Sequence, residues 1–242
     1  MKADDAPEWM KLDLHIHTLD DPKDRLDYSA RELLARARRL GFSVLAITLH
    51  DKVWRDDAVS AAAERMGILL IPAAEMRIQG ADIILLNVTA DDVSALKTFA
   101  DVRALRKRLG NSLFTIAPHP FYRLGGSIGR RLIDEIDCFD AIEFCHFHKG
   151  IFNPNRRAVS VAAEFGKPVI ATSDAHRLHA FGHHYTMLPR SPKLTTDEVF
   201  EQLRSGHIRI HSPAATLIEL LSTFYFVFIK HPLRGLFSWR GA

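Results

Sequence analysis

Apolar runs of strand length alternate with amphipathic helical patterns along most of the chain. The apolar runs predict strands over residues 12–16, 43–48, 68–73, 83–88, 113–117, 141–144 and 168–172. The helical spacing of apolar residues predicts helices over residues 29–40, 57–66, 91–109, 155–165 and 196–205. This alternation is typical of strand–helix units built around a mostly parallel sheet, so we expect an α/β fold.

The first predicted helix carries a signal at each end. Ser29 followed by Glu32 has the pattern of a capping box, in which each residue satisfies a backbone N–H near the other. Gly41 is typical of a helix stop. We therefore expect this helix to begin and end close to these residues.

The composition fits one sizeable domain. The chain has 242 residues, of which 47% are hydrophobic, and its formal net charge is +3. This mildly basic balance permits an anionic substrate without requiring one. Basic residues at 36–39 and 103–108 stand beside leucines and alanines at helical spacing, so we interpret them as solvated helix faces.

Cysteine content and the N-terminal residues favour a reducing compartment. The chain has only Cys138 and Cys145, which cannot form a framework of disulfides. Residues 1–11 lack the apolar core of a signal peptide. No apolar run reaches the roughly 18 to 20 residues that a membrane-spanning helix needs. We therefore expect a cytoplasmic protein.

Histidines and carboxylates follow several of the predicted strands. His15 and His17 are one residue apart at the end of the first strand, so their side chains project to the same face. The ends of later strands carry His50, Glu75, His119, Asp174 and His176. In barrel enzymes the carboxyl ends of different strands supply the catalytic groups. Imidazoles and carboxylates without a thiolate pair suit Zn, Mn or Fe in a hydrolytic site. A second His-x-His, His146 and His148, is left out of this set.

These motifs resemble those of the PHP (polymerase and histidinol phosphatase) domain family. The resemblance rests on His15-Ile16-His17-Thr18, Thr48-x-His50, Glu75, His119-Pro120 and Ser173-Asp174-Ala175-His176, in the family's order, over about residues 11–190. It implies a distorted (β/α)7 TIM-like barrel that holds two to three divalent ions. By the same resemblance, His15, His17, Glu75 and Asp174 bind one ion, Glu75 and His119 a second, and His50 and His176 a third.

The chain departs from the family's pattern at three places. Leu49 stands where the family usually has an acid, which removes a partner for a ligand but no expected ligand. Ile83 and Ile84 stand where many members have a histidine, so the second ion has fewer ligands. The carboxylate expected after the first motif is open among Asp20, Asp21 and Asp24, and we favour Asp21 or Asp24 as a metal ligand.

The resemblance implies a metal-dependent phosphoesterase that uses a metal-activated water. Its substrate would be a small phosphomonoester, a nucleotide or an oligonucleotide end. Arg177 and His183 are the candidates for binding the substrate phosphate, with Lys52 and Arg123 also near the motifs. Nucleic acid is a second candidate partner, although no nucleic-acid-binding motif supports it. The alternatives are a barrel amidohydrolase acting on a C–N bond and a non-catalytic metal-binding module.

The composition changes near the C-terminus. We expect a PHP-like domain over residues 1–212 and an apolar and basic helical tail over residues 213–242. Residues 217–229 are nearly all apolar, and basic residues follow them. Apolar residues along one stripe of this predicted helix favour packing or self-association. Further apolar residues on its opposite side favour contact with a membrane surface.

Overall fold

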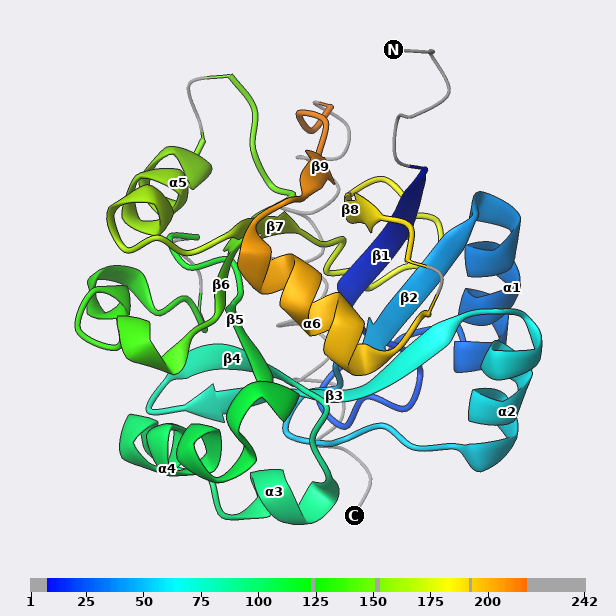
Figure 1. Ribbon diagram of the computed structural model, residues 1–242, viewed down its shortest axis with the longest axis horizontal. Coiled ribbons are helices and arrows are strands. Elements are labelled where there is room, and N and C mark those ends of the chain that lie inside the picture. The colour runs from blue at the N-terminus through cyan, green and yellow to red at the C-terminus, as the bar shows by residue number, and fades with distance from the viewer. Residues whose placement is uncertain (1–7, 123–124, 151–152, 192, 217–242) are drawn as a thin grey trace, which may run out of the picture.

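The computed structural model describes residues 8–122, 125–150, 153–191 and 193–216, and shows one curved sheet with helices outside it (Figure 1). The strands are β1 (Trp9–Ile16), β2 (Phe42–Ile47), β3 (Leu69–Ile78), β4 (Ala81–Leu86), β5 (Phe114–Ala117), β6 (Ala141–Phe144), β7 (Val169–Ala171), β8 (Tyr185–Pro189) and β9 (Arg209–His211). The helices are α1 (Ala30–Leu40), α2 (Asp57–Arg65), α3 (Ala90–Ser94), α4 (Phe99–Leu109), α5 (Asn155–Glu164) and α6 (Thr196–Ser205). Short 3-10 turns occupy Gly110–Ser112, Gly129–Leu132 and Ile136–Cys138.

The sheet has the strand order β7-β6-β5-β4-β3-β2-β1-β8-β9. Strands β1 to β3 pair in parallel, as do β5 to β7, whereas β4 is antiparallel to both of its neighbours and β8 is antiparallel to β1. Thr186 on β8 donates to the carbonyl of Ala171 and accepts from its N–H, at 2.8 and 2.9 Å. These bonds join β7 to β8, so the sheet is nearly closed into a barrel.

The predicted α/β barrel-like class is confirmed, but the count of seven strand–helix units is not. Strand β3 turns directly into β4 through Gln79 and Gly80, which both have positive φ, as a two-residue hairpin requires. Strands β8 and β9 were not predicted from the sequence. Strand β8 is buried only at alternate positions and β9 is exposed along its length, so neither gives the signal of the apolar runs in the parallel strands.

The helix predicted over residues 91–109 is divided into α3 and α4. Thr98 caps α4: its hydroxyl accepts from the N–H of Asp101, and the Asp101 carboxylate accepts from the N–H of Thr98. Apolar periodicity continues through this second capping box, so the pattern alone did not reveal the break. At α1, by contrast, the capping box of Ser29 with Glu32 and the left-handed Gly41 are confirmed.

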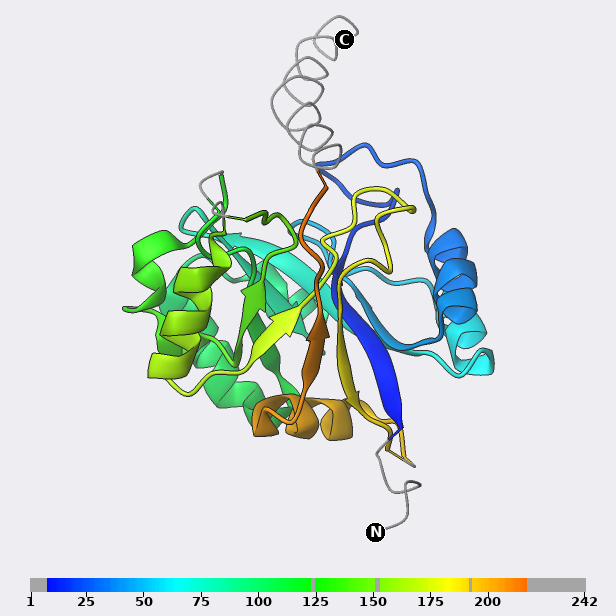
Figure 2. The ribbon, with the colours of Figure 1, turned by 90° about the horizontal axis from the view of Figure 1, so that it is seen from above.

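Apolar side chains fill the barrel and the space beneath the helices. Inside, residues such as Leu12, Val44 and Ile116 form one cluster with Phe200 and Leu203 of α6. Helix α6 lies across the end of the barrel at which β1 begins (Figure 2). The outer helices cover two further clusters. Because α6 covers this end, polar chemistry is confined to the opposite end, where the parallel strands finish.

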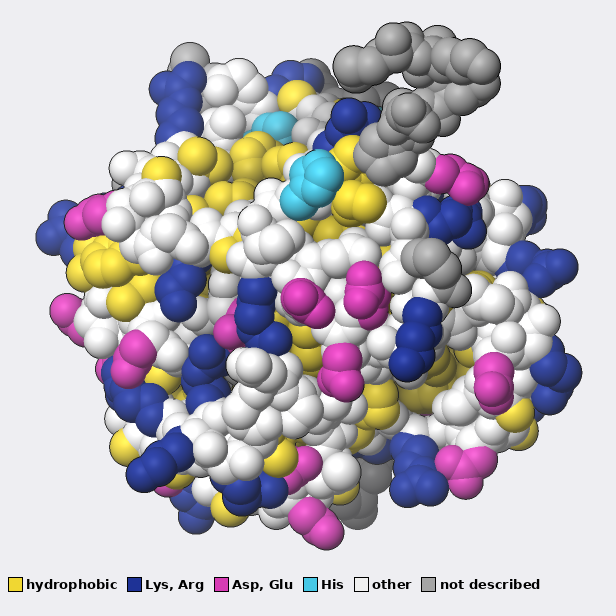
Figure 3. Space-filling model, in the orientation of Figure 1, with side chains coloured by type: hydrophobic (Ala, Val, Ile, Leu, Met, Phe, Trp, Pro, Cys, Tyr) yellow, Lys and Arg dark blue, Asp and Glu magenta, His cyan; other side chains and the backbone are white. Residues whose placement is uncertain are grey.

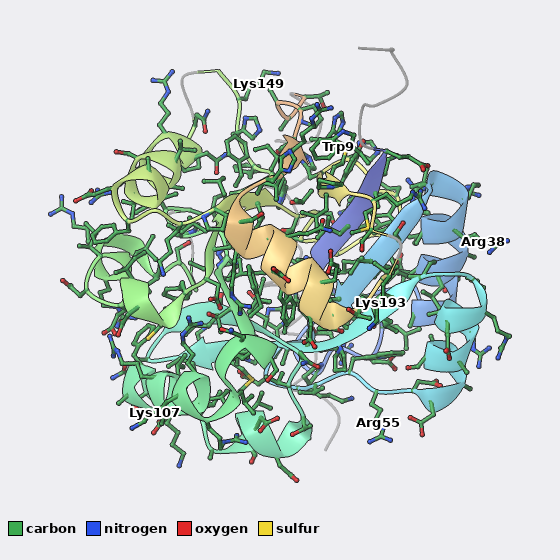
Figure 4. The ribbon with its side chains drawn as sticks, viewed as in Figure 1. Trp9, Arg38, Arg55, Lys107, Lys149 and Lys193 are labelled. Atoms are coloured by element: carbon green, nitrogen blue, oxygen red, sulfur yellow. The ribbon has the colours of Figure 1, made fainter. Side chains whose placement is uncertain are left out.

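The interpretation of the basic runs as solvated holds for part of them: Arg38, Arg39, Lys107 and Arg108 are exposed, whereas Arg36, Arg103 and Arg106 are half-buried. Figure 3 shows basic and acidic side chains interspersed over the end that α6 covers. Arg38 on α1 and Lys107 on α4 project away from the sheet (Figure 4). Within the described ranges, no helix combines the length and apolarity needed to cross a membrane. The predicted tail from residue 217 onward lies outside the described residues, so its role stays a prediction.

One buried ion pair ties the α6 end of the barrel together and supports a stability prediction. The Asp140 carboxylate accepts from Arg106 Nη1 at 2.7 Å and from the Thr115 N–H at 2.8 Å, and Arg204 Nε lies 3.4 Å away. Burial favours the neutral acid, but the arginines outweigh burial and lower the pKa of Asp140. We expect Asp140→Asn to reduce the free energy of unfolding by about 2 kcal/mol, because it removes the carboxylate that pairs with the half-buried side chains of Arg106 and Arg204.

The direction of the pKa shift of Asp140 determines how this loss of unfolding free energy depends on pH. The folded pKa lies below the unfolded value of about 3.9, so the stabilisation is complete above that value and disappears as pH falls through the folded pKa. Urea unfolding should therefore show that the free energies of unfolding of the unchanged protein and Asp140→Asn differ by a constant amount from pH 7 to about pH 5. This difference should become smaller below about pH 4. Equal stability at pH 7 would contradict the role assigned to Asp140.

Candidate metal centre

The carboxyl ends of five parallel strands bring the predicted ligands together. His15 lies in β1 and His17 directly after it, Glu75 lies in β3, and the remaining ligands follow β2, β5 and β7. The Thr48 hydroxyl accepts from the N–H of Ile16 and donates to its carbonyl, which fixes the ends of β1 and β2 side by side. Each of three groups contains at least one of His15, His17 and Glu75: His15, Glu75 and His119; His15, His17 and Asp174; and His17, His50 and Glu75. In each of these groups the candidate ligand atoms lie within 4.8 Å of one another.

The Glu75 carboxylate lies among four imidazoles. Its Oε2 is 3.5 Å from His15 Nε2, 3.3 Å from His17 Nε2 and 3.3 Å from His50 Nε2, and its Oε1 is 3.4 Å from His119 Nε2. The two oxygens thus face different sets of nitrogens. A carboxylate in this position can serve two cations at once.

Two of the buried ring nitrogens that face the carboxylates of this cluster lack hydrogen bonds. Nε2 of His15 and Nε2 of His17 have no hydrogen-bond partner among the described residues. They lie 3.3 and 3.5 Å from Asp174 Oδ1. A buried polar atom without a partner costs roughly 1–3 kcal/mol. A divalent cation that both nitrogens and the neighbouring carboxylates bind would remove this cost, so the donor set fits a metal ion.

The other ring nitrogens of these histidines are held by carboxylates. His15 Nδ1 donates to Glu143 Oε1 at 2.9 Å, and Asp21 Oδ2 is 3.0 Å from Nδ1 of His17 and of His50. A partner at Nδ1 fixes the orientation of an imidazole and leaves Nε2 for a metal. The three rings are therefore oriented with Nε2 toward Glu75.

The two favoured aspartates occupy different positions. Asp21 is buried and also accepts from the backbone N–H groups of Lys23, Asp24 and His50. Asp24 Oδ2 lies 2.9 Å from His176 Nε2 and 3.8 Å from His50 Nδ1. Asp21, Asp24 and His50 together form a further group that can hold an ion. Asp20, the third candidate, instead accepts from the indole N–H of Trp54 at 2.9 Å.

Glu143 is a residue of this site that the sequence analysis did not select. It lies one residue before the end of β6, is 1% exposed, and its Oε1 accepts from His15 and from the Thr172 hydroxyl. Its Oε2 accepts from the backbone N–H of His119 at 2.6 Å. A charged residue in the short apolar run of β6 was the available signal, since unpaired acids are almost never fully buried. Glu143 therefore connects two candidate ligands from different strands, His15 of β1 and His119 after β5.

Two candidate ligands sit on strained backbone. His119 has a φ of 31° and Asp174 a φ of 47°, in the left-handed region that disfavours residues with a Cβ. Strain of this kind persists where neighbouring groups enforce it and is common at functional sites. Glu143 holds the N–H of His119, and Asp13 Oδ1 accepts from the N–H of Ser173 at 3.1 Å. Buried carboxylates therefore fix both turns.

The imidazoles and carboxylates determine one another's ionisation. Burial favours the neutral form of Glu75, but the facing imidazoles of His15 and His119 outweigh burial and hold its pKa well below the ordinary value. Burial also disfavours protonated His119, but Glu75 outweighs this and raises the pKa of His119 to about 9. Glu75 is therefore ionised at neutral pH, as a metal ligand must be.

The departures from the family's pattern have structural counterparts. Leu49 is fully buried in the core beneath α1 and α2, and its carbonyl accepts from the N–H of Glu75 at 3.1 Å. Ile84 is the direct β4 partner of Glu75, so an apolar side chain occupies the position beside the carboxylate. His146 belongs to none of the grouped ligand sets of the described residues, although the charges of Asp174 and Glu143 act on it. Its ring lies 5.6 Å from that of His184, and His148 is in edge contact with Phe144.

The predicted phosphate-binding residues lie in loops near the cluster. Arg177 and His183 belong to the segment between β7 and β8 that also carries Asp174 and His176. Arg177 is half-buried and His183 is exposed. Lys52 is exposed and donates to the carbonyl of Asp20 at 3.5 Å, whereas Arg123 lies outside the described residues.

Comparison with known proteins gives one family match and several structural neighbours. Residues 152–208 match the PHP-associated family model. No curated protein sequence matches the chain. Among solved structures, a two-domain protein from Bacteroides vulgatus that contains a predicted PHP-like metal-dependent phosphoesterase has 19% identity and a TM-score of 0.65, over 92% of this chain and 71% of that one.

Two further neighbours differ in their named activities. The lesion-specific endonuclease Q from Pyrococcus furiosus has 14% identity and a TM-score of 0.60, over 90% of this chain and 66% of that one. An amidohydrolase from Chromobacterium violaceum with bound sulfate has 15% identity and a TM-score of 0.52, over 82% of this chain and 97% of that one. At these identities the likeness concerns the fold. The predicted resemblance is thus confirmed: the chain has the fold of PHP-like metal-dependent phosphoesterases and carries a PHP-associated segment at residues 152–208.

Proposed function

We propose that the protein is a metal-dependent phosphoesterase. The observation that carries this proposal is the Glu75 carboxylate, which faces four imidazoles at 3.3–3.5 Å where the parallel strands end. Zn, Mn or Fe ions bound there would supply an activated water and would stabilise charge on the attacking and leaving oxygens of a phosphoester. The protein's own side chains hold the ions and orient the substrate.

The ligand assignment takes the three sets that the resemblance to the PHP family implies and adds Asp24, whose Oδ2 lies 2.9 Å from His176 Nε2. We assign His15, His17, Glu75 and Asp174 to one ion, Glu75 and His119 to a second, and His50, His176 and Asp24 to a third. Asp21 is the less suitable oxygen ligand of the two favoured aspartates, since its Oδ2 already bonds His17 and His50. The second ion has the fewest ligands because Ile84 stands beside Glu75.

The substrate class is a small phosphomonoester, a nucleotide or an oligonucleotide end. The likeness to endonuclease Q keeps nucleic acid as a candidate substrate. Arg177, His183 and Lys52 are candidates for phosphate binding because their loops adjoin the ligands. The buried free thiols of Cys138 and Cys145 support a reducing, cytoplasmic setting.

Hydrolysis of a C–N bond is the second candidate function, favoured by the amidohydrolase from Chromobacterium violaceum. Strands β3 to β6 carry no lysine, so a metal-bridging carboxylated lysine in a middle strand, which would favour that chemistry, has no candidate there. A non-catalytic module would not need to retain so many facing imidazoles and carboxylates. Their number therefore argues against that function.

The test is phosphate release from a panel of phosphomonoesters, phosphodiesters and nucleotides by protein loaded with Mn²⁺, Zn²⁺ or Fe²⁺. We expect turnover of at least one class, and loss of that turnover in His17→Ala, whose ring nitrogens face Glu75, Asp174 and Asp21. Turnover that persists in His17→Ala would contradict the proposal. Cleavage of amide or amidine substrates without phosphate release would favour the second candidate.

A further inference from the structure

Arg77 stands at the rim of the barrel on the same strand as Glu75. Alternate residues of a strand project to one face, so Arg77 shares the barrel-lining face with Glu75 and Ala73, whereas Ala74 and Met76 pack on the helix side. Two residues along a strand cover about 7 Å. The Arg77 side chain therefore begins one pleat beyond Glu75, toward the open end of the barrel.

Asp82 holds the guanidinium of Arg77 in place. The two residues are direct partners of β3 and β4, and Arg77 Nε and Nη2 donate to the two oxygens of the Asp82 carboxylate. Gly126 packs against this pair: its carbonyl accepts from the Asp82 N–H at 2.7 Å. With its φ of 101°, a Cβ at Gly126 would lie 1.8 Å from Asp82 Oδ2 and 2.9 Å from Arg77 Nη2. Glycine is thus required for this close packing.

Both loops around Arg77 carry candidate metal ligands. Asp51, which follows His50, accepts from the Arg77 N–H at 2.8 Å and donates its own N–H to the Glu75 carbonyl at 2.8 Å. Gly126 belongs to the loop that follows His119. Arg77 is therefore framed by the segments that position His50 and His119, next to the cluster rather than on a remote surface.

One edge of the guanidinium is left available. The Arg77 side chain is 38% exposed, and its Nη1 donates to no acceptor among the described residues. Asp82 occupies the edge formed by Nε and Nη2, so the edge formed by Nη1 and Nη2 can still bind a second anion. Such a planar fork matches the oxygens of a phosphate group.

We propose that Arg77 binds a phosphate group of the substrate beside the metal centre, with Asp82 as the residue that positions it. This assignment rests on the proposed phosphoesterase function and specifies its phosphate-binding residue. The chain places a fixed cation next to a site built from imidazoles and carboxylates, where a phosphate would otherwise meet the negative charge of Glu75 and Asp174.

The test is binding of inorganic phosphate to the metal-loaded full chain, measured by isothermal titration calorimetry. We expect Arg77→Ala to raise the Kd for phosphate by about tenfold or more, since a hydrogen-bonded charge pair is lost. Arg77→Lys keeps the charge but not the fork, and we expect a Kd several-fold above that of the unchanged protein. The matched control is Arg108→Ala, which breaks the ion pair between Arg108 of α4 and Asp92 of α3 and should leave the Kd unchanged.

Metal content and circular dichroism of each variant show whether it is folded and loaded. If Arg77→Ala does not fold, the Kd of Arg77→Lys for phosphate tests the proposal. Unchanged phosphate affinity in a loaded Arg77 variant would overturn the proposal, and so would an unchanged protein that binds no phosphate. Failure of the proposed function is distinguishable, because it would appear as absent turnover of phosphoesters while the effect of Arg77 on phosphate binding persists.

Discussion

Replacing Glu75 with glutamine is expected to abolish turnover by the metal-loaded protein, with a loss of about 10³-fold or more. The substitution keeps the shape of the side chain but removes the charge that faces His15, His17, His50 and His119. A divalent ion contributes several kcal/mol of transition-state stabilisation, and each 1.36 kcal/mol is a factor of about ten in rate. Initial rates of phosphate release at saturating metal measure the effect.

Glu64→Gln is the matched control, because Glu64 is an exposed glutamate on α2. It should turn over substrate as the unchanged protein does. Metal content should fall in Glu75→Gln, since this carboxylate faces more than one group of ligands. A fully active Glu75→Gln protein would show that the cluster is not the reaction centre.

The second large effect is expected at Glu143, through metal affinity rather than through the reaction itself. Glutamine at this position would place an amide N–H₂ or a neutral oxygen against His15 Nδ1 and the His119 N–H. Loss of a partner that orients a metal ligand typically lowers metal affinity about 10- to 100-fold. We therefore expect Glu143→Gln to require correspondingly more metal for half-maximal activity and to recover much of its turnover at high metal concentration.

A titration of activity with metal distinguishes this positioning role from direct contact of Glu143 with the substrate. Glu164→Gln, an exposed glutamate on α5, is the control and should titrate as the unchanged protein does. A Glu143→Gln protein whose turnover stays low at every metal concentration, with full metal content, would indicate that Glu143 contacts the substrate. An unchanged titration would show that the hydrogen bonds of Glu143 are dispensable.

The sequence predicted the parallel strands well because they are buried on both faces. Runs such as Val44–Ile47 and Val169–Ala171 are apolar throughout, so their composition identifies them. Strand β9 is exposed along its length and offered no such signal. The reversal of β4 depends on a two-residue turn at Gln79 and Gly80, and periodicity does not report strand direction.

For the site as well, the sequence revealed the residues that stand at apolar runs and not those whose roles depend on contacts far away in the chain. His15, His17, His50, Glu75, His119, Asp174 and His176 could be selected because each follows or ends an apolar run, and strand ends of a parallel barrel meet at one rim. Glu143 was missed because its role depends on contacts with residues 128 and 24 positions away in the sequence. The separate places of Asp21 and Asp24 likewise depend on how their loop folds around His17 and His50.

The central claim is that this histidine–carboxylate cluster is a metal centre, and metal content tests it most directly. The measurement is inductively coupled plasma mass spectrometry of the purified protein after loading with Mn²⁺ or Zn²⁺ and removal of free metal, with His17→Ala treated in parallel. The account predicts two to three ions per chain, since Glu75 faces two sets of imidazoles and His50, His176 and Asp24 offer a third set of ligands, and it predicts a clear loss of metal in His17→Ala. A metal content no higher than that of folded His17→Ala would contradict it.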